Sequence, residues 1–155
     1  MNKVKIGVIG AGWWATENHI PHLAERDEVE LTSVCKLEED QLNFVKNKFN
    51  FKHASTDFKE MLDLSYLDGV VISSPHHAHY ENAKAALEKD CHVMIEKPMT
   101  TIAQEAEILL QLAKNKNKHI LIPNGFNFKK FMSKAEEIIK NGMIGDIQHI
   151  DAAFS

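Results

Sequence analysis

The stretch Val4-Lys5-Ile6-Gly7-Val8-Ile9-Gly10-Ala11-Gly12-Trp13-Trp14-Ala15 joins an apolar run to a glycine-rich turn near the amino end of the chain. The apolar run predicts a buried strand, and the segment 12–25 that follows has the length and period of a helix. In such a unit the first glycine permits a tight turn, and the second lets the backbone approach a pyrophosphate. A small third residue, here Ala15, brings the helix close to the strand. The stretch therefore predicts a phosphate-binding turn, in which free backbone amides at the start of the helix hold the anion.

The rest of the chain alternates in the same way between short apolar runs and longer segments of helical period. Strands are expected at 4–9, 29–35, 67–72, 92–95 and 119–122. Helices are expected at 12–25, 38–49, 58–64, 76–89 and 100–116. The strands are apolar along nearly their whole length, as expected where helices cover both faces of a parallel sheet. The predicted fold is an α/β, Rossmann-type doubly wound parallel sheet, in which ligands bind beyond the carboxyl ends of the strands.

The composition is that of an ordinary globular domain. The chain has 155 residues, of which 44% are hydrophobic and 26% charged, and its net charge is -4. Since there is no run of like charge, neither nucleic acid nor an anionic membrane surface is expected as a partner. The amino end lacks the pattern of a secretory leader, and Cys35 and Cys91 form no CxxC pair. We therefore expect a cytoplasmic protein with reduced, buried thiols.

A lysine follows the second predicted strand, where many dinucleotide-binding domains carry an acidic residue that receives the ribose hydroxyls. This residue is Lys36. An ammonium group cannot accept those hydrogen bonds, but it pairs well with a 2'-phosphate. The position therefore favours NADP over NAD as the cofactor. Glu38, two residues further on, leaves NAD open, and a solvated Lys36 without any cofactor contact is the remaining alternative.

Two further motifs follow predicted strands and carry a resemblance to a known family. Ser73-Ser74-Pro75-His76-His77-Ala78-His79 comes after the strand that ends at Ile72, and Glu96-Lys97-Pro98 comes after the strand that ends at Ile95. In both motifs the chain resembles the Gfo/Idh/MocA oxidoreductases, which have a small residue, Pro, three residues and His after one strand and Glu-Lys-Pro after the next. The segment 135–147 also resembles the part of these proteins that leads into their second domain.

The resemblance implies a role for each matching residue. Lys97 would lie beside the nicotinamide as the catalytic residue and donate a hydrogen bond to the reacting oxygen of the substrate, where its ammonium stabilises negative charge. Glu96 would contact the nicotinamide ribose, and Pro98 would fix the turn. The other cofactor-binding residues expected are Gly10, Ala11, Gly12, Trp13, Trp14, Lys36, Ser73, Ser74, Pro75, His79 and Asn124. His79 is expected to be structural or to contact the cofactor, not to carry a proton.

Aromatic and histidine side chains near these motifs admit other roles. Trp13 and Trp14 either pack on the core or on the rest of the protein, or form a wall of the cofactor or substrate cleft. His76, His77 and His79 lack a fourth ligand and supporting carboxylates at a recognisable spacing, so no metal site is expected. His19 and His22, three residues apart on the first helix, are expected to have surface or core roles.

The carboxyl-terminal part departs from the family in one position. An arginine often follows the last strand in the family, but its place falls on Asn127 here, with Lys129 or Lys130 as candidate substitutes. We expect residues 1–122 to form the NAD(P)-binding domain. Residues 123–155 are expected to form a linker helix and the first strand, Ile147 to Phe154, of a truncated second α/β domain. An open strand edge favours pairing with a second copy, so a homo-oligomer through this segment is predicted.

The sequence thus predicts the dinucleotide-binding part of an NAD(P)-dependent oxidoreductase. The intact enzyme would transfer hydride between the nicotinamide and a hydroxyl-bearing carbon of a sugar, cyclitol or similar small molecule. The family's other catalytic residues, an Asp and a His, belong to its second domain, so this chain by itself is expected to be inactive. The alternative is a non-enzymatic NAD(P)-binding sensor, against which Glu96 and Lys97 argue. A methyltransferase also has a glycine-rich turn, but the other two motifs have no role there.

Overall fold

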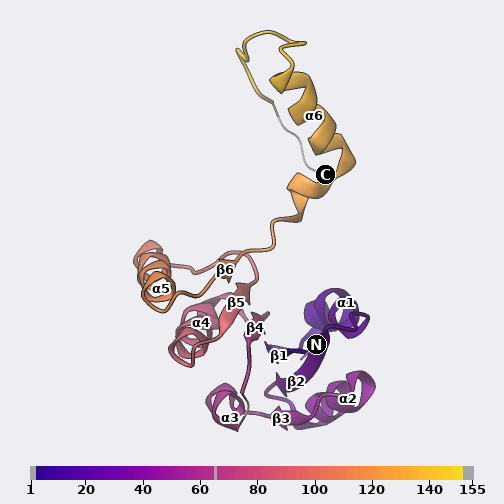
Figure 1. Ribbon diagram of the computed structural model, residues 1–155, viewed down its shortest axis with the longest axis vertical. Coiled ribbons are helices and arrows are strands. Elements are labelled where there is room, and N and C mark those ends of the chain that lie inside the picture. The colour runs from indigo at the N-terminus through magenta and orange to yellow at the C-terminus, as the bar shows by residue number, and fades with distance from the viewer. Residues whose placement is uncertain (1–2, 65, 152–155) are drawn as a thin grey trace. The chain divides into compact units, whose positions relative to one another are not determined.

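The computed structural model describes residues 3–64 and 66–151, and the chain divides into two compact units. The first unit extends to Pro123 and the second begins at Asn124. The first holds a six-stranded sheet in the order β3-β2-β1-β4-β5-β6, in which every neighbouring pair is parallel (Figure 1). This is the strand order of a dinucleotide-binding sheet. The predicted Rossmann-type fold is therefore confirmed.

The strands end in one row across the sheet. Their bounds are Val4–Ile9 for β1, Val29–Cys35 for β2, His53–Ser55 for β3, Gly69–Ile72 for β4, His92–Ile95 for β5 and Ile120–Leu121 for β6. Ile9 is in register with Cys35 on one side and with Ile72 on the other. Ile72 in turn is in register with Ile95. The turns that follow β2, β1, β4 and β5 therefore emerge side by side at one edge of the sheet.

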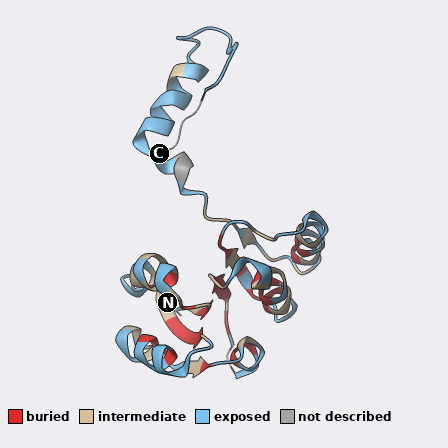
Figure 2. Ribbon diagram, turned by 180° about the vertical axis from the view of Figure 1, so that it is seen from behind, coloured by how far each residue is buried: buried red, intermediate tan, exposed pale blue. Residues whose placement is uncertain are grey.

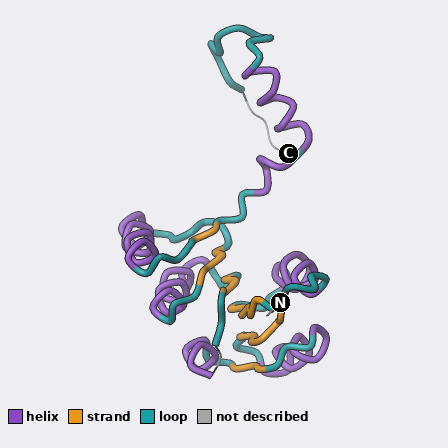
Figure 3. Tube along the Cα trace, viewed as in Figure 1, coloured by secondary structure: helices purple, strands orange, loops and turns teal. Residues whose placement is uncertain are grey.

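Helices connect the strands on both faces of the sheet (Figures 1 and 3). They are the π-helical turn η1 (Ala15–His19), α1 (Ile20–Ala24), α2 (Glu39–Phe49), α3 (Phe58–Leu64), the short η2 (His76–Ala78), α4 (His79–Glu88) and α5 (Ala103–Asn115). Two helical residues, Trp13 and Trp14, precede η1. Local sequence explains the ends of α2: acidic residues occupy its first turn, and Asn50 ends it in the left-handed conformation, with φ 58°.

The core consists of two apolar clusters, one on each face of the sheet (Figure 2). Ile9 packs with the helices α3, α4 and α5, whereas its neighbour Val8 packs with α1 and α2. Successive side chains of a strand point to opposite faces, so a strand covered on both sides must be apolar at consecutive positions. Val70 and Val71 divide between the clusters in the same way. The two-sided core thus accounts for the continuous apolar runs of the sequence.

Some of the predicted elements differ from the observed ones. Strand β3 was not predicted, because it has only three residues, His53–Ser55, and the first of them is polar and exposed. The strands expected at 67–72 and 119–122 are shorter, since pairing begins at Gly69 and is limited to Ile120–Leu121. The helix expected at 12–25 contains the π-helical turn, for which the apolar period gives no signal.

The second unit contains η3 (Gly125–Phe128) and α6 (Lys130–Lys140). Ten of the eleven residues of α6 are exposed, and the eleventh, Ile138, is partly buried. The strand expected at 147–154 is absent from 147–151, where no neighbouring backbone forms a ladder, and 152–155 lie outside the described residues. The assignment of this segment to a second domain and the homo-oligomer remain predictions. Within the described residues, no helix is both long and apolar enough to cross a membrane.

Candidate functional site

The glycine turn after β1 is pressed against the turn after β4. Gly10 has φ 86°, and a Cβ placed there would lie 2.3 Å from the backbone nitrogen of Ser74. The Ser73 N–H donates to the Ile9 carbonyl at 2.8 Å, which fixes the two turns together. A Cβ on Gly12, in contrast, would meet no atom within 4 Å. Gly10 is therefore required by the fold itself, whereas Gly12 leaves the backbone accessible from outside.

A cleft of about 420 Å³ opens at this edge of the sheet. Five of the predicted cofactor residues line it: Gly10, Gly12, Lys36, Ser74 and Pro75. The fold thus brings together residues from the turns after β1, β2 and β4. A side chain at position 12 would project into this space, because Gly12 lines the cleft and has no protein atom near its missing Cβ. The cleft accordingly fits a ligand that approaches the backbone closely, as a dinucleotide phosphate does.

The sequence analysis assigned no role at the site to seven lining residues: Ile9, Cys35, Leu37, Thr56, Phe58, Ala78 and Asn82. Thr56 and Phe58 follow β3, the strand that was not predicted, so their position at the cleft had no signal. Leu37 is 80% exposed although it is apolar. This exposure is known only from the folded chain, and single exposed apolar residues are common, so Leu37 gives no signal of a ligand surface in the sequence. His77, which the sequence analysis weighed only as a metal ligand, also lines the cleft.

Lys36 and Glu38 form an ion pair at the cleft. The Lys36 ammonium lies 2.8 Å from a Glu38 carboxylate oxygen, and its hydrogen bond lowers the pKa of Glu38 below the usual range. Only 14% of the Lys36 side chain is exposed, against 59% of the Glu38 side chain. The lysine is thus held at the cleft, whereas the glutamate is on its solvent side. A phosphate in the cleft would compete with Glu38 for the same ammonium group.

His79 connects the turns after β4 and β5. It is fully buried, and its Nε2 lies 2.9 Å from the Ser74 carbonyl oxygen while its Nδ1 lies 2.8 Å from that of Pro98. Both partners are carbonyl oxygens, which only accept hydrogen bonds. A cofactor group could reach a ring nitrogen only by replacing one of them. The geometry therefore supports the structural alternative for His79, and the Ser74 hydroxyl is likewise engaged by Asn82 Oδ1 at 2.7 Å.

Glu96 is the centre of a second group of side chains, at the end of β5. Its Oε1 accepts from Trp14 Nε1–H at 2.8 Å and lies 2.7 Å from His19 Nε2, and its Oε2 accepts from the Lys97 backbone N–H at 3.2 Å. Burial alone would raise the pKa of Glu96. The hydrogen bonds from Trp14, His19 and Lys97 outweigh this effect, so the pKa of Glu96 is lowered. The carboxylate is thus held as an anion.

The Glu96→Gln variant should show a smaller loss of stability in acid than the original chain. Because the folded-state pKa of Glu96 is lowered, its ionised form stabilises the fold above the unfolded pKa of about 4.3, and this contribution disappears as the pH falls through the folded pKa. Urea unfolding at neutral pH and below about pH 4 measures the difference. Glu107→Gln, which removes an exposed carboxylate of α5, is the control and should lose as much stability in acid as the original chain. Equal acid losses in the original chain and the Glu96→Gln variant would contradict this role.

Of the remaining predicted residues, Ala11 is buried and Ser73 is partly buried, whereas Lys97, Trp13, Trp14 and Asn124 are exposed. Lys97 lies directly after β5. Asn124 is the first residue of the second unit, so the structure of the first unit does not test the predicted contact between Asn124 and the cofactor. Trp13 is 73% and Trp14 44% exposed, and their rings lie 5.8 Å apart. The alternative that one of them packs in the core of this unit is therefore wrong. Asn127 lies among the residues whose side chains are not described. Among residues 3–64 and 66–151 there is no group of three or more side chains that could hold a metal ion.

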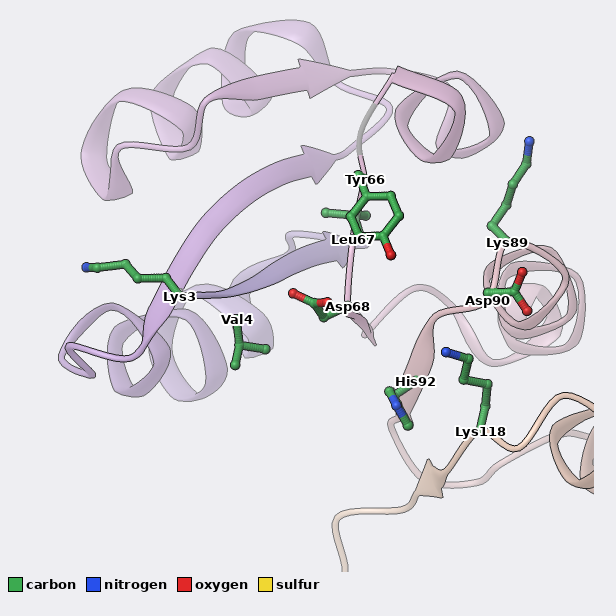
Figure 4. A pocket seen from close by; sticks show the side chains of 9 residues that line it. All are labelled: Lys3, Val4, Tyr66, Leu67, Asp68, Lys89, Asp90, His92 and Lys118. Atoms are coloured by element: carbon green, nitrogen blue, oxygen red, sulfur yellow. The ribbon is translucent and has the colours of Figure 1, made fainter. Parts of the chain in front are cut away.

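A second hollow, of about 460 Å³, lies at the opposite edge of the sheet (Figure 4). Its two acidic side chains have partners within the protein: Asp68 accepts the Lys5 backbone N–H at 2.7 Å, and Asp90 pairs with Lys116 at 2.9 Å. Ligands of open parallel sheets bind at the carboxyl ends of the strands, and this hollow adjoins the amino ends of β1, β4 and β5. The cleft beside the glycine turn is therefore the candidate site.

The sequence is similar to those of known proteins. Residues 4–124 match the family described as "Oxidoreductase family, NAD-binding Rossmann fold". Over 144 residues the chain is 29% identical to D-glucoside 3-dehydrogenase of Escherichia coli strain K12, covering 93% of the chain and 41% of that protein. Over 151 residues it is 30% identical to glucose-6-phosphate 3-dehydrogenase of Bacillus subtilis strain 168, covering 97% and 42%.

A solved structure shows the same fold. The crystal structure of myo-inositol 2-dehydrogenase from Lactobacillus plantarum superimposes with a TM-score of 0.86 at 26% sequence identity. The match covers 94% of the present chain and 43% of that chain. In each of these three comparisons the chain spans about two fifths of the length of the protein that it resembles.

Proposed function

Because the chain belongs to the Gfo/Idh/MocA family of oxidoreductases, we propose that the protein in which it functions transfers hydride between NAD(P) and a hydroxyl-bearing carbon of a sugar or cyclitol. The chain is the NAD(P)-binding domain of such an oxidoreductase. The observation that best supports this proposal is the cleft lined by Gly10 and Gly12. It lies at the edge of the sheet where β5 ends, and Lys97 follows β5 directly. The methyltransferase alternative does not agree with the family.

The residues of the cleft suggest how this domain contributes. Backbone amides around Gly12, at the start of the helix, would hold the pyrophosphate, and Lys36 would lie toward the adenosine end. When bound, the nicotinamide accepts or donates the hydride. Lys97 has an exposed ammonium group at the opposite end of the row of turns, where it would donate a hydrogen bond to the substrate oxygen. Charge that develops on that oxygen during the transfer would be stabilised there.

The substrate class rests on the similar proteins and not on the cleft. Their names describe dehydrogenases of a glucoside, of glucose 6-phosphate and of myo-inositol. All three substrates carry adjacent secondary hydroxyl groups, whose oxidation gives a ketone. We propose the same class for the protein that contains this chain. If the protein is instead a non-enzymatic NAD(P)-binding sensor, it should oxidise none of these compounds even though it has Lys97.

Binding of a nicotinamide dinucleotide to the chain is the direct test of its role. Trp13 and Trp14 are its two tryptophans, and both flank the glycine turn, so their emission should change when NADPH or NADH is added. Bound nucleotide should also raise the unfolding temperature in proportion to the logarithm of its concentration. If neither nucleotide changes the emission or the unfolding temperature, the domain does not bind the cofactor.

The Lys36→Gln variant should bind NADPH about tenfold more weakly and NADH as before, because a single charge pair with the 2'-phosphate is worth about 1.4 kcal/mol. The matched control is Glu38→Gln, which removes the carboxylate that competes for Lys36 and should strengthen NADPH binding. Both variants keep a polar side chain, and thermal unfolding without nucleotide checks that each of them is folded. If the original chain binds NADH more tightly than NADPH, the preference assigned to Lys36 is wrong.

A further inference from the structure

The π-helical turn η1 brings two side chains to one point. Trp14 and His19 are five residues apart, and both lie within hydrogen-bond distance of the same oxygen, Glu96 Oε1. In an α-helix residues five apart differ by about 140° around the axis, so they would not face the same group. A π-helical turn replaces the i→i+4 bond with an i→i+5 bond, which the Ile20 N–H makes here to the Ala15 carbonyl. The wider turn thus allows both side chains to reach Glu96.

The Glu96 carboxylate is engaged largely within the protein. Oε1 has two partners, Trp14 and His19, which use both of its lone pairs, and Oε2 accepts from the backbone N–H of Lys97. The residue is only 9% exposed. A carboxylate held in this way is poorly placed to serve mainly as a contact for the ribose. Its bond to the Lys97 N–H instead fixes the backbone from which the Lys97 side chain extends.

We propose that the Trp14–His19–Glu96 cluster is a positioning device for Lys97, in which His19 acts as a positioning residue through Glu96. The cluster joins the helix that follows the phosphate turn to the segment after β5. The proposal rests on the proposed function in one respect, namely that Lys97 lies at the nicotinamide end of the cofactor. It assigns His19 a role that its sequence position does not reveal, and it gives the π-helical turn a purpose.

The test compares two ligands that differ in the nicotinamide end. NADPH would place its nicotinamide beside Lys97, so its affinity should depend on the position of that side chain. The second ligand, 2',5'-ADP, has the adenosine and its phosphates but lacks the nicotinamide and its ribose. In the chain carrying His19→Leu, NADPH binding should weaken about tenfold, and 2',5'-ADP binding by less than about twofold. The emission of the bound nicotinamide, which reports its surroundings, should shift at the same time. A merely structural role for His19 would weaken both ligands equally.

Three further variants make the comparison specific. His19→Gln keeps a nitrogen donor at a similar distance and should restore NADPH binding to within about threefold of the original chain. His22→Leu, on the same helix but with its side chain 80% exposed, should bind both ligands as the original chain does. If His19 acts through Lys97, then His19→Leu should have little further effect once Lys97→Met is present, as a double-mutant cycle detects.

The outcomes separate this proposal from the proposed function. If the original chain binds neither NADPH nor NADH, the proposed function fails and this inference fails with it. If the original chain binds NADPH but His19→Leu leaves its affinity unchanged, weakens both ligands equally or adds its full effect to Lys97→Met, only the positioning role is overturned. Should His19→Leu not fold, Trp14→Phe removes the other donor to Glu96 while keeping an aromatic ring, and the same difference between the two ligands is expected.

Discussion

Replacing Gly10 with alanine is expected to destabilise the first unit by at least about 3 kcal/mol. The added Cβ would lie 2.3 Å from the Ser74 nitrogen, 2.5 Å from the Ser74 Cα and 2.6 Å from the Ser73 carbonyl carbon. These are backbone atoms in the turn after β4, which cannot move aside as a flexible side chain would. The φ of 86° is also unfavourable for any residue with a Cβ. Urea unfolding should show the loss as a lower midpoint with an unchanged slope.

Gly12→Ala is the matched control for this change. The two glycines lie in the same turn, but a Cβ at Gly12 meets no atom within 4 Å, and Gly12 does not have a positive φ. Its substitution by alanine should therefore change the free energy of unfolding by less than about 1 kcal/mol. If Gly10→Ala and Gly12→Ala had the same unfolding midpoint, the close approach of the turns after β1 and β4 would be refuted.

Gly12→Val should abolish dinucleotide binding while the domain stays folded. The side chain would occupy the cleft between the backbone amides and the ligand, because no protein atom competes for that space. We expect affinity for NADPH to fall at least about 100-fold, which corresponds to about 2.7 kcal/mol. Tryptophan emission measures the binding, and thermal unfolding without nucleotide confirms that the domain is intact.

Gly12→Ala again provides the intermediate case. A single methyl group should weaken NADPH binding less than the branched side chain of valine, so the three residues at this position should form an ordered series. If Gly12→Val bound NADPH as tightly as the original chain, the phosphates would have to lie elsewhere than at the glycine turn. Gly10→Ala, in contrast, should weaken binding only to the extent that it unfolds the domain.

Most of the fold could be predicted from the sequence because the sheet is covered on both faces. Consecutive apolar residues such as Val8 and Ile9 have to serve two different clusters, and this requirement leaves a clear signal in the sequence. Strand β3 could not be predicted in the same way. At the sheet edge, three residues pair with β2 through their backbone, and their side chains, His53 among them, need not be apolar.

Part of the candidate site could likewise be predicted from the sequence, and part of it could not. Motif residues such as Gly10, Lys36 and Glu96 are found from their places after strands, and the row of strand ends brings their turns to one edge of the sheet. The contact between His19 and Glu96 depends on the π-helical turn, and no apolar period records an i→i+5 arrangement. Phe58 and Asn82 reach the cleft from helices beside the sheet, so their contribution arises from packing and not from local sequence.

The common row in which the strands end also sets the distance between the two ends of the site. Lys36 follows β2 and Lys97 follows β5, and the order of the sheet places β1 and β4 between those two strands. Three strand spacings separate their strand ends, or about 14 Å at about 4.8 Å each. A ligand that contacts the turns after both β2 and β5 has to extend over about three strand spacings. The strand order thus favours an extended ligand with a recognised group at each end, independently of the side chains that contact it.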